Sequence, residues 1–429
     1  MRTHGPHGAG YAAGTMALVQ SIRRSRALQR MRPISLRLTD QFTWSGGYFL
    51  FNMSAAFAFP MSGYAAVTVS ATMGLIAATC VRSYALDGPL VAGTRAGVGL
   101  NEMFSAKVAW ASSVVGGSSA GILTSLWIWL STNETPSWTL PVLSITIVLA
   151  DAPHYLLTMK RAYNRALIIG GLYLLGGMLA IVMGRYFGST AVMLIWMTST
   201  LVCTFVGWML IGQSTRQVLG FPYRHISRRM GAESMYSALA SQLGIFLIYL
   251  TSDPSVTTGI RLAYSLVYAP AFMLIQGLAP LYLLRMSDLY RCPSEEGVRL
   301  SIYWISGACS LLTIAGASGF AAANFELFHN TKLEASIPYL VPVGLSIMGA
   351  IVFDAALLNW RFRVSPTFPH RARLGTVGVD LAAQVTGVLV AGPQGLVVAL
   401  ISTAALKVAF ASFIILKLRN RTASPLSST

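Results

Sequence analysis

Five charged side chains fall inside long apolar stretches of this sequence: Asp151, Arg261, Asp354, Asp380 and Lys407. A charge in a lipid-like environment is costly unless it faces protein or water, so each of these residues needs a partner or a wet cavity. Basic side chains of this kind can hold a phosphate group, and carboxylates can carry protons or bind cations. The alternative interpretation is a set of structural ion pairs between neighbouring helices.

The neighbours of these charges bear on that choice. Asp151 and His154 lie one helical turn apart, which predicts a polar stretch and leaves both interpretations open. Asp380 and Lys407 lie at compatible depths in consecutive apolar stretches, which favours an ion pair. No acidic residue is expected at the depth of Arg261 in the neighbouring stretches, and this favours a binding role for Arg261.

The composition requires lipid as a solvent for most of the chain. The 429 residues are 54% hydrophobic and only 10% charged, and the mean hydropathy is +0.61. The net charge of +17 would suggest a nucleic-acid partner in a soluble protein. Here the basic residues lie in short segments beside apolar stretches, so they indicate membrane topology and no nucleic acid is expected.

Motifs of soluble catalysis and metal binding are missing from the sequence. It has no phosphate-binding GxxxxGK[ST] loop and no HExxH, and it has no GxSxG in a connection long enough to fold. The four cysteines, Cys80, Cys203, Cys292 and Cys309, have neither CxxC spacing nor nearby histidines. We therefore expect no metal, no cofactor and no enzymatic activity.

Twelve apolar stretches are long enough to cross a bilayer as helices. The alternation of basic residues supports this count, because 27 of them fall on one side and only Arg185 and Lys332 fall on the other. The sequence therefore predicts twelve spans with both termini in the cytoplasm. The expected spans cover residues 42–60, 64–81, 108–131, 139–158, 165–184, 190–212, 235–252, 256–284, 300–322, 337–359, 374–392 and 395–416.

Two similar halves are expected, because each begins with a basic segment followed by a pair of spans with a short outer turn. We expect one six-helix lobe over residues 40–213 and a second over residues 233–418, joined by a cytoplasmic linker over residues 214–232. Residues 1–39 and 419–429 are expected to be disordered cytoplasmic tails, the first of them strongly basic.

Short strings in spans one, four and eight suggest a family. They are Asp40-Gln41 with Ser45, the segment from Arg82 to Pro89, Asp151-Ala152-Pro153-His154-Tyr155, and Gly259-Ile260-Arg261 with Pro270, Gln276-Gly277 and Pro280. This pattern resembles the Wzx-type polysaccharide flippases of the multidrug/oligosaccharidyl-lipid/polysaccharide exporter (MOP) superfamily. Two positions depart from it, since Ala150 stands where glutamine is usual and His154 where arginine is usual.

The resemblance implies an all-α integral membrane protein with two six-helix lobes around a central, often cationic cavity. It implies that Arg261, His154, Asp151, Arg82 and Gln276 line a substrate cavity, with Arg261 and His154 near a pyrophosphate and Arg82 at the cytoplasmic mouth. From the intramembrane charges alone, we expect Lys407 in the same cavity, and Asp354 and Asp380 in ion coupling or ion pairing. The expected activity is translocation of a lipid-linked oligosaccharide across the cell membrane by alternating access, by a monomer in contact with lipid and with other polysaccharide assembly proteins.

Two other functions remain open. A drug or cation antiporter of the same superfamily would use an acidic cavity around Asp151, Asp354 and Asp380. A membrane-embedded glycan polymerase or acyltransferase would need a large outer loop or a histidine in a cytoplasmic reaction centre. The short outer connections argue against the loop, and His225 and His370 are the only histidines suitable for the second arrangement.

Overall fold

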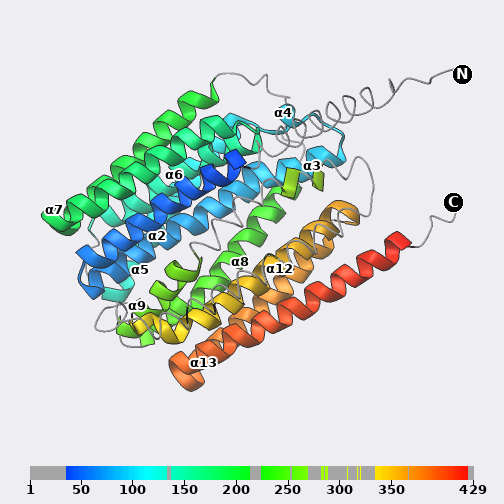
Figure 1. The fold of residues 1–429 in the computed structure, drawn as a ribbon. Helices are drawn as coiled ribbons and strands as arrows, with labels where there is room; N and C mark the ends of the chain where they lie inside the picture. Colours follow the sequence, from blue (N-terminus) through cyan, green and yellow to red (C-terminus); the bar gives the residue numbers. More distant parts are fainter. Residues whose placement is uncertain are drawn as a thin grey trace, which may run out of the picture.

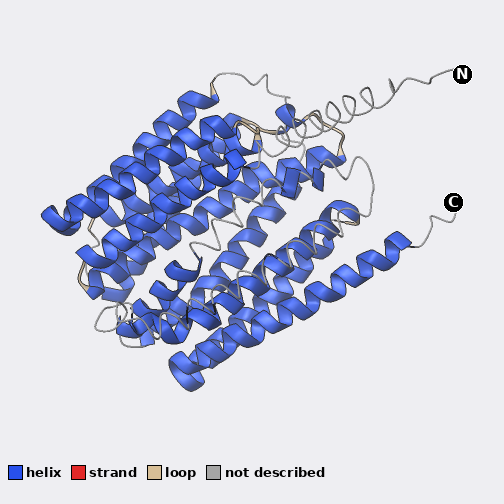
Figure 2. Cartoon of the chain, viewed as in Figure 1, coloured by secondary structure: helices blue, strands red, loops and turns tan. Residues whose placement is uncertain are grey.

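A computed structural model describes most of the chain as helices packed side by side (Figure 1). The described residues are 35–132, 137–212, 224–251, 254–268, 334–365 and 367–423, with short pieces at 282–284, 286–287, 307, 316 and 319. Within these residues there is no β-strand, and the connecting loops are short (Figure 2). The all-α expectation is confirmed for this part of the chain.

Helices α2 and α3 form one continuous rod that follows the first helix. After the helix over residues 35–58, α2 spans Met61–Arg82 and continues through a π-helical turn, Ser83–Asp87, into α3, Gly88–Arg95. The short helix α4, Leu100–Met103, follows α3. Single π-helical turns inside longer helices are frequent at functional sites.

Three further helices complete the first half. They are α5 (Ala106–Thr132), α6 (Thr139–Met159) and α7 (Tyr163–Ile211). The 49 residues of α7 are two helices joined at Gly188, whose φ of 73° is in the region that favours glycine. Trp196 donates a hydrogen bond to the Tyr173 hydroxyl, at 2.8 Å, so the two arms of α7 fold back on each other.

The second half has the same helical character. It contains α8 (Arg224–Thr251), α9 (Pro254–Ala263) with a π-helical turn to Tyr268, a 3-10 turn over Glu334–Tyr339, α12 (Leu340–Arg363) and α13 (Thr367–Ala423). The 57 residues of α13 are also two arms, separated by non-helical backbone at Ala391 and Gly392. Pro393 follows this turn and begins the second arm.

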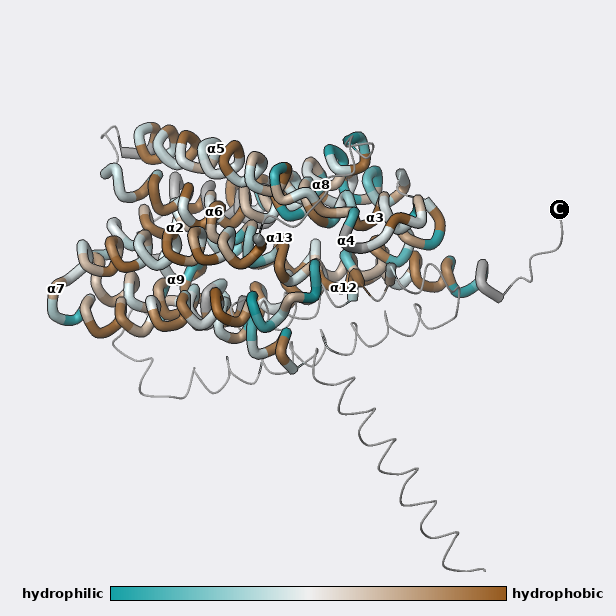
Figure 3. The backbone as a smooth tube through the Cα atoms, turned by 90° about the horizontal axis from the view of Figure 1, so that it is seen from above, coloured by the Kyte–Doolittle hydropathy of each residue, from teal (hydrophilic) through white to brown (hydrophobic). Residues whose placement is uncertain are grey.

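Six described helices are long and apolar enough to cross a membrane, and α7 and α13 each contain two of the expected spans. Figure 3 shows long brown and white helices, with most of the hydrophilic stretches near the end that holds α3 and α4. The chain is an integral membrane protein. The count of twelve stays a prediction, because most of the expected ninth span, 300–322, lies outside the described residues.

The expected boundaries of tails and linker are wrong where the structure describes them. The first helix begins at residue 35, α8 begins at Arg224 and α13 continues to Ala423. Arg37 explains the first difference, because its side chain is 1% exposed and bonds Asp40 and Gln41 inside the protein. A basic residue that is buried in this way looks like part of a cytoplasmic tail in the sequence alone.

Two large hydrophobic clusters stabilise the described helices. One draws mainly on residues 44–211 and includes the stacked rings of Phe51 and Trp196, whose centroids are 5.1 Å apart. The other draws on residues 248–418 and includes Phe353 and Trp360. The first cluster also takes in residues of the second half, such as Met230 and Leu262, and the arrangement as two six-helix lobes remains a prediction.

A close contact between glycines holds the arms of α13 together. A Cβ atom at Gly387 would collide with the backbone of Gly395, and the reverse also holds. We expect Gly387→Ala to destabilise the protein by about 1 to 3 kcal/mol, because the arms must separate to admit the methyl group. A fall in the thermal unfolding temperature of the detergent-solubilised protein would show this. Gly375→Ala is the control, because that position has open space, and an equal effect of both changes would contradict the prediction.

Candidate functional site

A cavity of about 490 Å³ lies between the two halves of the protein. The helix over residues 35–58 and helices α2, α6 and α7 supply its wall from the first half. Helices α8, α9, α12 and α13 supply the opposite wall. The volume is in the range of sites that hold a small molecule or a substrate headgroup.

The described lining of the cavity is balanced in charge. Its basic residues are Arg82, Arg261, Arg361, Arg373 and Lys407, and its acidic residues are Asp87, Asp151, Glu233, Asp354 and Asp380. Four of the basic residues form ion pairs with four of the acidic ones. The expected cationic cavity is therefore not found in the described lining, since most positive charges there are matched by a carboxylate.

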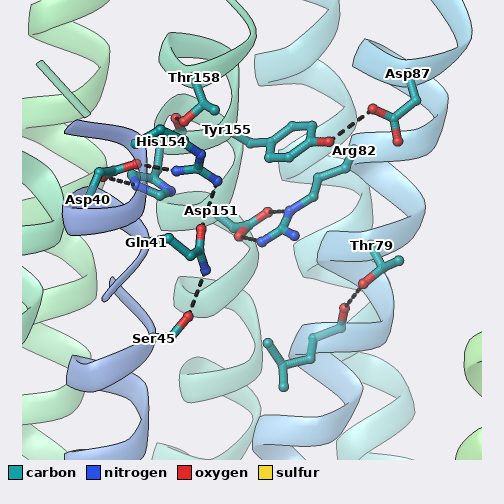
Figure 4. Close-up of polar contacts among 12 residues, drawn as sticks. Asp40, Gln41, Ser45, Thr79, Arg82, Asp87, Asp151, His154, Tyr155 and Thr158 are labelled. Atoms are coloured by element: carbon teal, nitrogen blue, oxygen red, sulfur yellow. Dashed lines mark hydrogen bonds and ion pairs between the residues drawn. The ribbon is translucent and has the colours of Figure 1, made fainter. Parts of the chain in front are cut away.

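Arg82 and Asp151 form a two-bonded ion pair at the first-half wall (Figure 4). The Arg82 Nε lies 2.5 Å from Asp151 Oδ2, and both side chains are almost fully buried. The guanidinium carbon also lies 4.9 Å from the ring centre of Tyr155, whose hydroxyl donates to Asp87 at 3.1 Å. Arg82 lines the cavity, and Asp151 of α6 pairs with its guanidinium.

His154 lies behind the cavity wall rather than in it, which corrects the expectation of a pyrophosphate contact. The imidazole is 2% exposed, and its Nε2 lies 2.8 Å from Asp40 Oδ1 (Figure 4). The ring stacks on Trp44 with centroids 4.3 Å apart and an interplanar angle of 13°. Trp44 lines the cavity and covers the histidine, because the first helix packs directly over this turn of α6.

The polar string at the start of span one is a buried network. Arg37 bonds both Asp40 and Gln41, and the Gln41 amide donates to the Ser45 hydroxyl at 2.6 Å (Figure 4). The strings of spans one and four, which carried the family resemblance, thus meet through Asp40 and His154. Distance along the chain concealed this contact, since the two residues are 114 positions apart.

Arg261 lines the cavity from the second half and reaches across to the first. Helix α9 places it with only 8% of the residue exposed, and its Nη2 donates to the Thr72 hydroxyl at 2.6 Å. Tyr48 and Tyr264 also line the cavity. This contact brings a strong hydrogen-bond donor with a permanent charge to the boundary between the halves.

The remaining charged residues of the lining are also paired. Lys407 and Asp380 form an ion pair, at 2.6 Å, between the arms of α13, and their functional roles stay predictions. Asp354 pairs with Arg373 at 2.5 Å, and its side chain is 52% exposed. Gln276, the last of the expected cavity residues, lies outside the described residues.

Three of the four ion pairs of the lining were not anticipated, and one of these joins α8 to α12. Glu233 is paired with Arg361, and its other oxygen lies 3.3 Å from the His370 Nδ1. In the sequence, Arg361 and His370 fall in a basic segment between two expected spans, and Glu233 falls just before the span expected at 235–252. Glu233 is a lone acidic residue among several basic residues expected at one membrane surface. That pattern could have predicted an ion pair there.

The halves also touch at the end of the cavity near α3. The hydroxyl oxygens of Thr94 and Ser287 are 2.7 Å apart, Arg95 donates to the Arg361 carbonyl at 3.0 Å, and Ser234 donates to Ser83 at 2.5 Å. We call these three contacts the seal. Among the described residues, no group of three metal-binding side chains exists.

Comparisons with known proteins fix the fold. No family model matches the sequence, and neither does any curated protein. Solved structures do match. The outward-facing conformation of a multidrug resistance MATE family transporter of the MOP superfamily is 14% identical, covers 90% of this chain and 97% of its own, and gives a TM-score of 0.60. A Vibrio cholerae MATE transporter is 12% identical, covers 93% and 98%, and gives 0.62.

The chain has the fold of the MATE transporters. A transporter of the MOP superfamily from Pyrococcus furiosus shares the MATE-type fold, with 15% identity, 90% and 97% coverage and a TM-score of 0.54. That protein is described as having a binding pocket of reverse polarity that suggests a different function. Within this fold, the pocket residues therefore matter more for function than the arrangement of helices.

Proposed function

We propose that this protein translocates a lipid-linked oligosaccharide across the cell membrane by alternating access. The MATE-type fold supports a membrane transporter of the MOP superfamily. The strings in spans one, four and eight, which resemble the Wzx-type flippases, support the saccharide substrate. We also propose that both termini are cytoplasmic and that the protein acts as a monomer beside other polysaccharide assembly proteins.

The position of Arg261 is the observation on which this proposal rests. It is a buried guanidinium in the wall of a cavity between the halves, and its Nη2 donates to the Thr72 hydroxyl. A pyrophosphate group offers oxygens that can form charge-assisted hydrogen bonds with a guanidinium, and these are about twice as strong as neutral ones. A neutral hydroxyl is a weaker acceptor, so a phosphate can displace it.

Replacing Arg261 tests the proposal in cells that lack other flippases and depend on this protein for surface glycan. We expect Arg261→Ala to reduce glycan assembly at least about tenfold, because one charge-assisted hydrogen bond contributes 1.5 to 3 kcal/mol. Arg261→Lys, which keeps the charge but loses the planar donor arrangement, should retain an intermediate activity. Arg185→Ala is the control, because Arg185 is exposed beside the Gly188 turn of α7, away from the seal. Normal glycan assembly by Arg261→Ala at wild-type protein levels would refute the proposal.

A drug or cation antiporter is the second candidate function. The acidic residues of the lining, among them Asp151 and Asp380, and the MATE-type fold favour it. Efflux of ethidium or methyltriphenylphosphonium from cells that express the protein distinguishes the two functions. Efflux that depends on Asp380 but not on Arg261, without complementation of glycan assembly, would favour the antiporter.

A further inference from the structure

The two walls of the cavity differ in chemistry. Of the basic residues in the described lining, only Arg82 comes from the first half, and Arg261, Arg361, Arg373 and Lys407 come from the second. Besides the carboxylates Asp87 and Asp151, the first half supplies a row of hydroxyl and amide side chains along the helix over residues 35–58 and along α2. These are Ser45, Asn52, Thr68, Thr72 and Thr79.

Hydrogen bonds within α2 use the hydroxyl protons of Thr68 and Thr79 in this polar wall. The Thr68 hydroxyl donates to the Tyr64 carbonyl at 2.7 Å, and the Thr79 hydroxyl donates to the Leu75 carbonyl at 2.8 Å (Figure 4). A hydroxyl has one donor and two acceptor lone pairs, so each oxygen can still accept a hydrogen bond. Thr72 is an example of such an acceptor, because its hydroxyl oxygen accepts the hydrogen bond from Arg261.

A row of acceptors on one wall, with the Arg261 guanidinium reaching toward it from the other, favours a ligand with two unlike ends. Sugar hydroxyls can donate to Thr68 and Thr79, whereas an ionised phosphate has only acceptors and is repelled by them. We infer that the cavity holds a sugar phosphate in one orientation, with sugar hydroxyls on Thr68 and Thr79 and the phosphate on Arg261. This inference rests on the proposed function and specifies how its substrate is held.

Two probes that differ only in the sugar test the orientation. They are farnesyl diphosphate and farnesyl-diphosphate-linked N-acetylglucosamine, and their Kd values would be measured on the full-length protein in lipid nanodiscs. We expect the wild type to bind the sugar-bearing probe more tightly. The double variant Thr68→Val, Thr79→Val should bind it about 20-fold more weakly, at about fivefold for each lost hydrogen bond, with an unchanged Kd for farnesyl diphosphate. Arg261→Gln should weaken both probes to the same extent.

Matched controls come from hydroxyls with the same kind of bond outside the described lining. Ser54 donates to the Leu50 carbonyl at 2.7 Å, and Thr204 donates to the Thr200 carbonyl at 2.8 Å. The double variant Ser54→Ala, Thr204→Val should keep the preference for the sugar. The inference is overturned if the Thr68 and Thr79 variant keeps that preference, or if it loses affinity for both probes equally.

The same measurements separate failure of this inference from failure of the proposed function. If the wild type binds farnesyl diphosphate through Arg261 and gains nothing from the sugar, only the orientation is wrong. If it binds neither farnesyl compound but binds methyltriphenylphosphonium, the saccharide function is wrong as well. The acceptor wall would then serve a cationic substrate.

Discussion

Replacing Arg82 with alanine should lower the free energy of unfolding by about 3 to 5 kcal/mol, the usual cost of removing one partner from a buried ion pair. Arg82 and Asp151 are bonded through two pairs of atoms, and their side chains are 9% and 4% exposed. Without Arg82, the Asp151 carboxylate would be left buried without its partner. Denaturant unfolding of the purified protein, followed by tryptophan fluorescence, measures this loss.

Further variants show whether the loss comes from the unmatched charge. The double variant Arg82→Met, Asp151→Leu should recover most of the stability, because it removes both charges and fills the same space. Arg371→Ala, at an exposed position of α13, should change the stability little. The explanation is wrong if Arg82→Ala unfolds at the wild-type denaturant concentration, or if the double variant is less stable than the single one.

A disulfide across the seal should stop transport almost completely. The Thr94 and Ser287 hydroxyl oxygens are 2.7 Å apart, so cysteines at these two positions can come within the roughly 2.05 Å of a sulfur-sulfur bond after a small adjustment. If transport requires the halves to separate at this end, the crosslinked protein cannot complete a cycle. We expect activity to fall at least about tenfold on oxidation and to return with dithiothreitol, since a locked state cannot be repopulated.

The crosslinking experiment needs a background without the four native cysteines, each replaced by alanine. The single variants Thr94→Cys and Ser287→Cys are the controls, and oxidant should leave their transport unchanged. Transport is measured as glycan assembly or as cation efflux, whichever the wild type performs. Undiminished transport by a fully crosslinked protein would mean that the halves do not part at the seal.

The sequence predicts most helices well because lipid imposes a simple rule on composition. The span expected at 139–158 is α6, Thr139–Met159, and α7 divides at Gly188, in the gap between the spans expected at 165–184 and 190–212. The pair of Asp380 and Lys407 was predictable for a related reason. Two opposite charges in adjacent apolar stretches at matching depths have few other ways to be stabilised.

The sequence does not predict the cavity wall equally well, because its residues come from helices that are distant along the chain. His154 occupies a position where the resemblance suggested a pocket cation, yet Trp44 stacks over it and Asp40 binds it. Arg37 and Arg361 appeared as topology signals, although both are buried in ion pairs. Counting charges on each side of a membrane does not separate a basic residue that faces water from one that turns inward.

The continuous helical rod formed by α2, the π-helical turn and α3 joins two functions in one element. It carries Thr68, Thr72 and Thr79 in the cavity wall, and Ser83, Thr94 and Arg95 at the seal. A helical segment of 34 residues, Ser62–Arg95, is about 50 Å long. A tilt of this rod would move the cavity-wall threonines and the seal contacts together. Binding and opening are linked thermodynamically. A ligand that favours the state in which the halves are separated at the seal must therefore bind more tightly when a mutation weakens the seal.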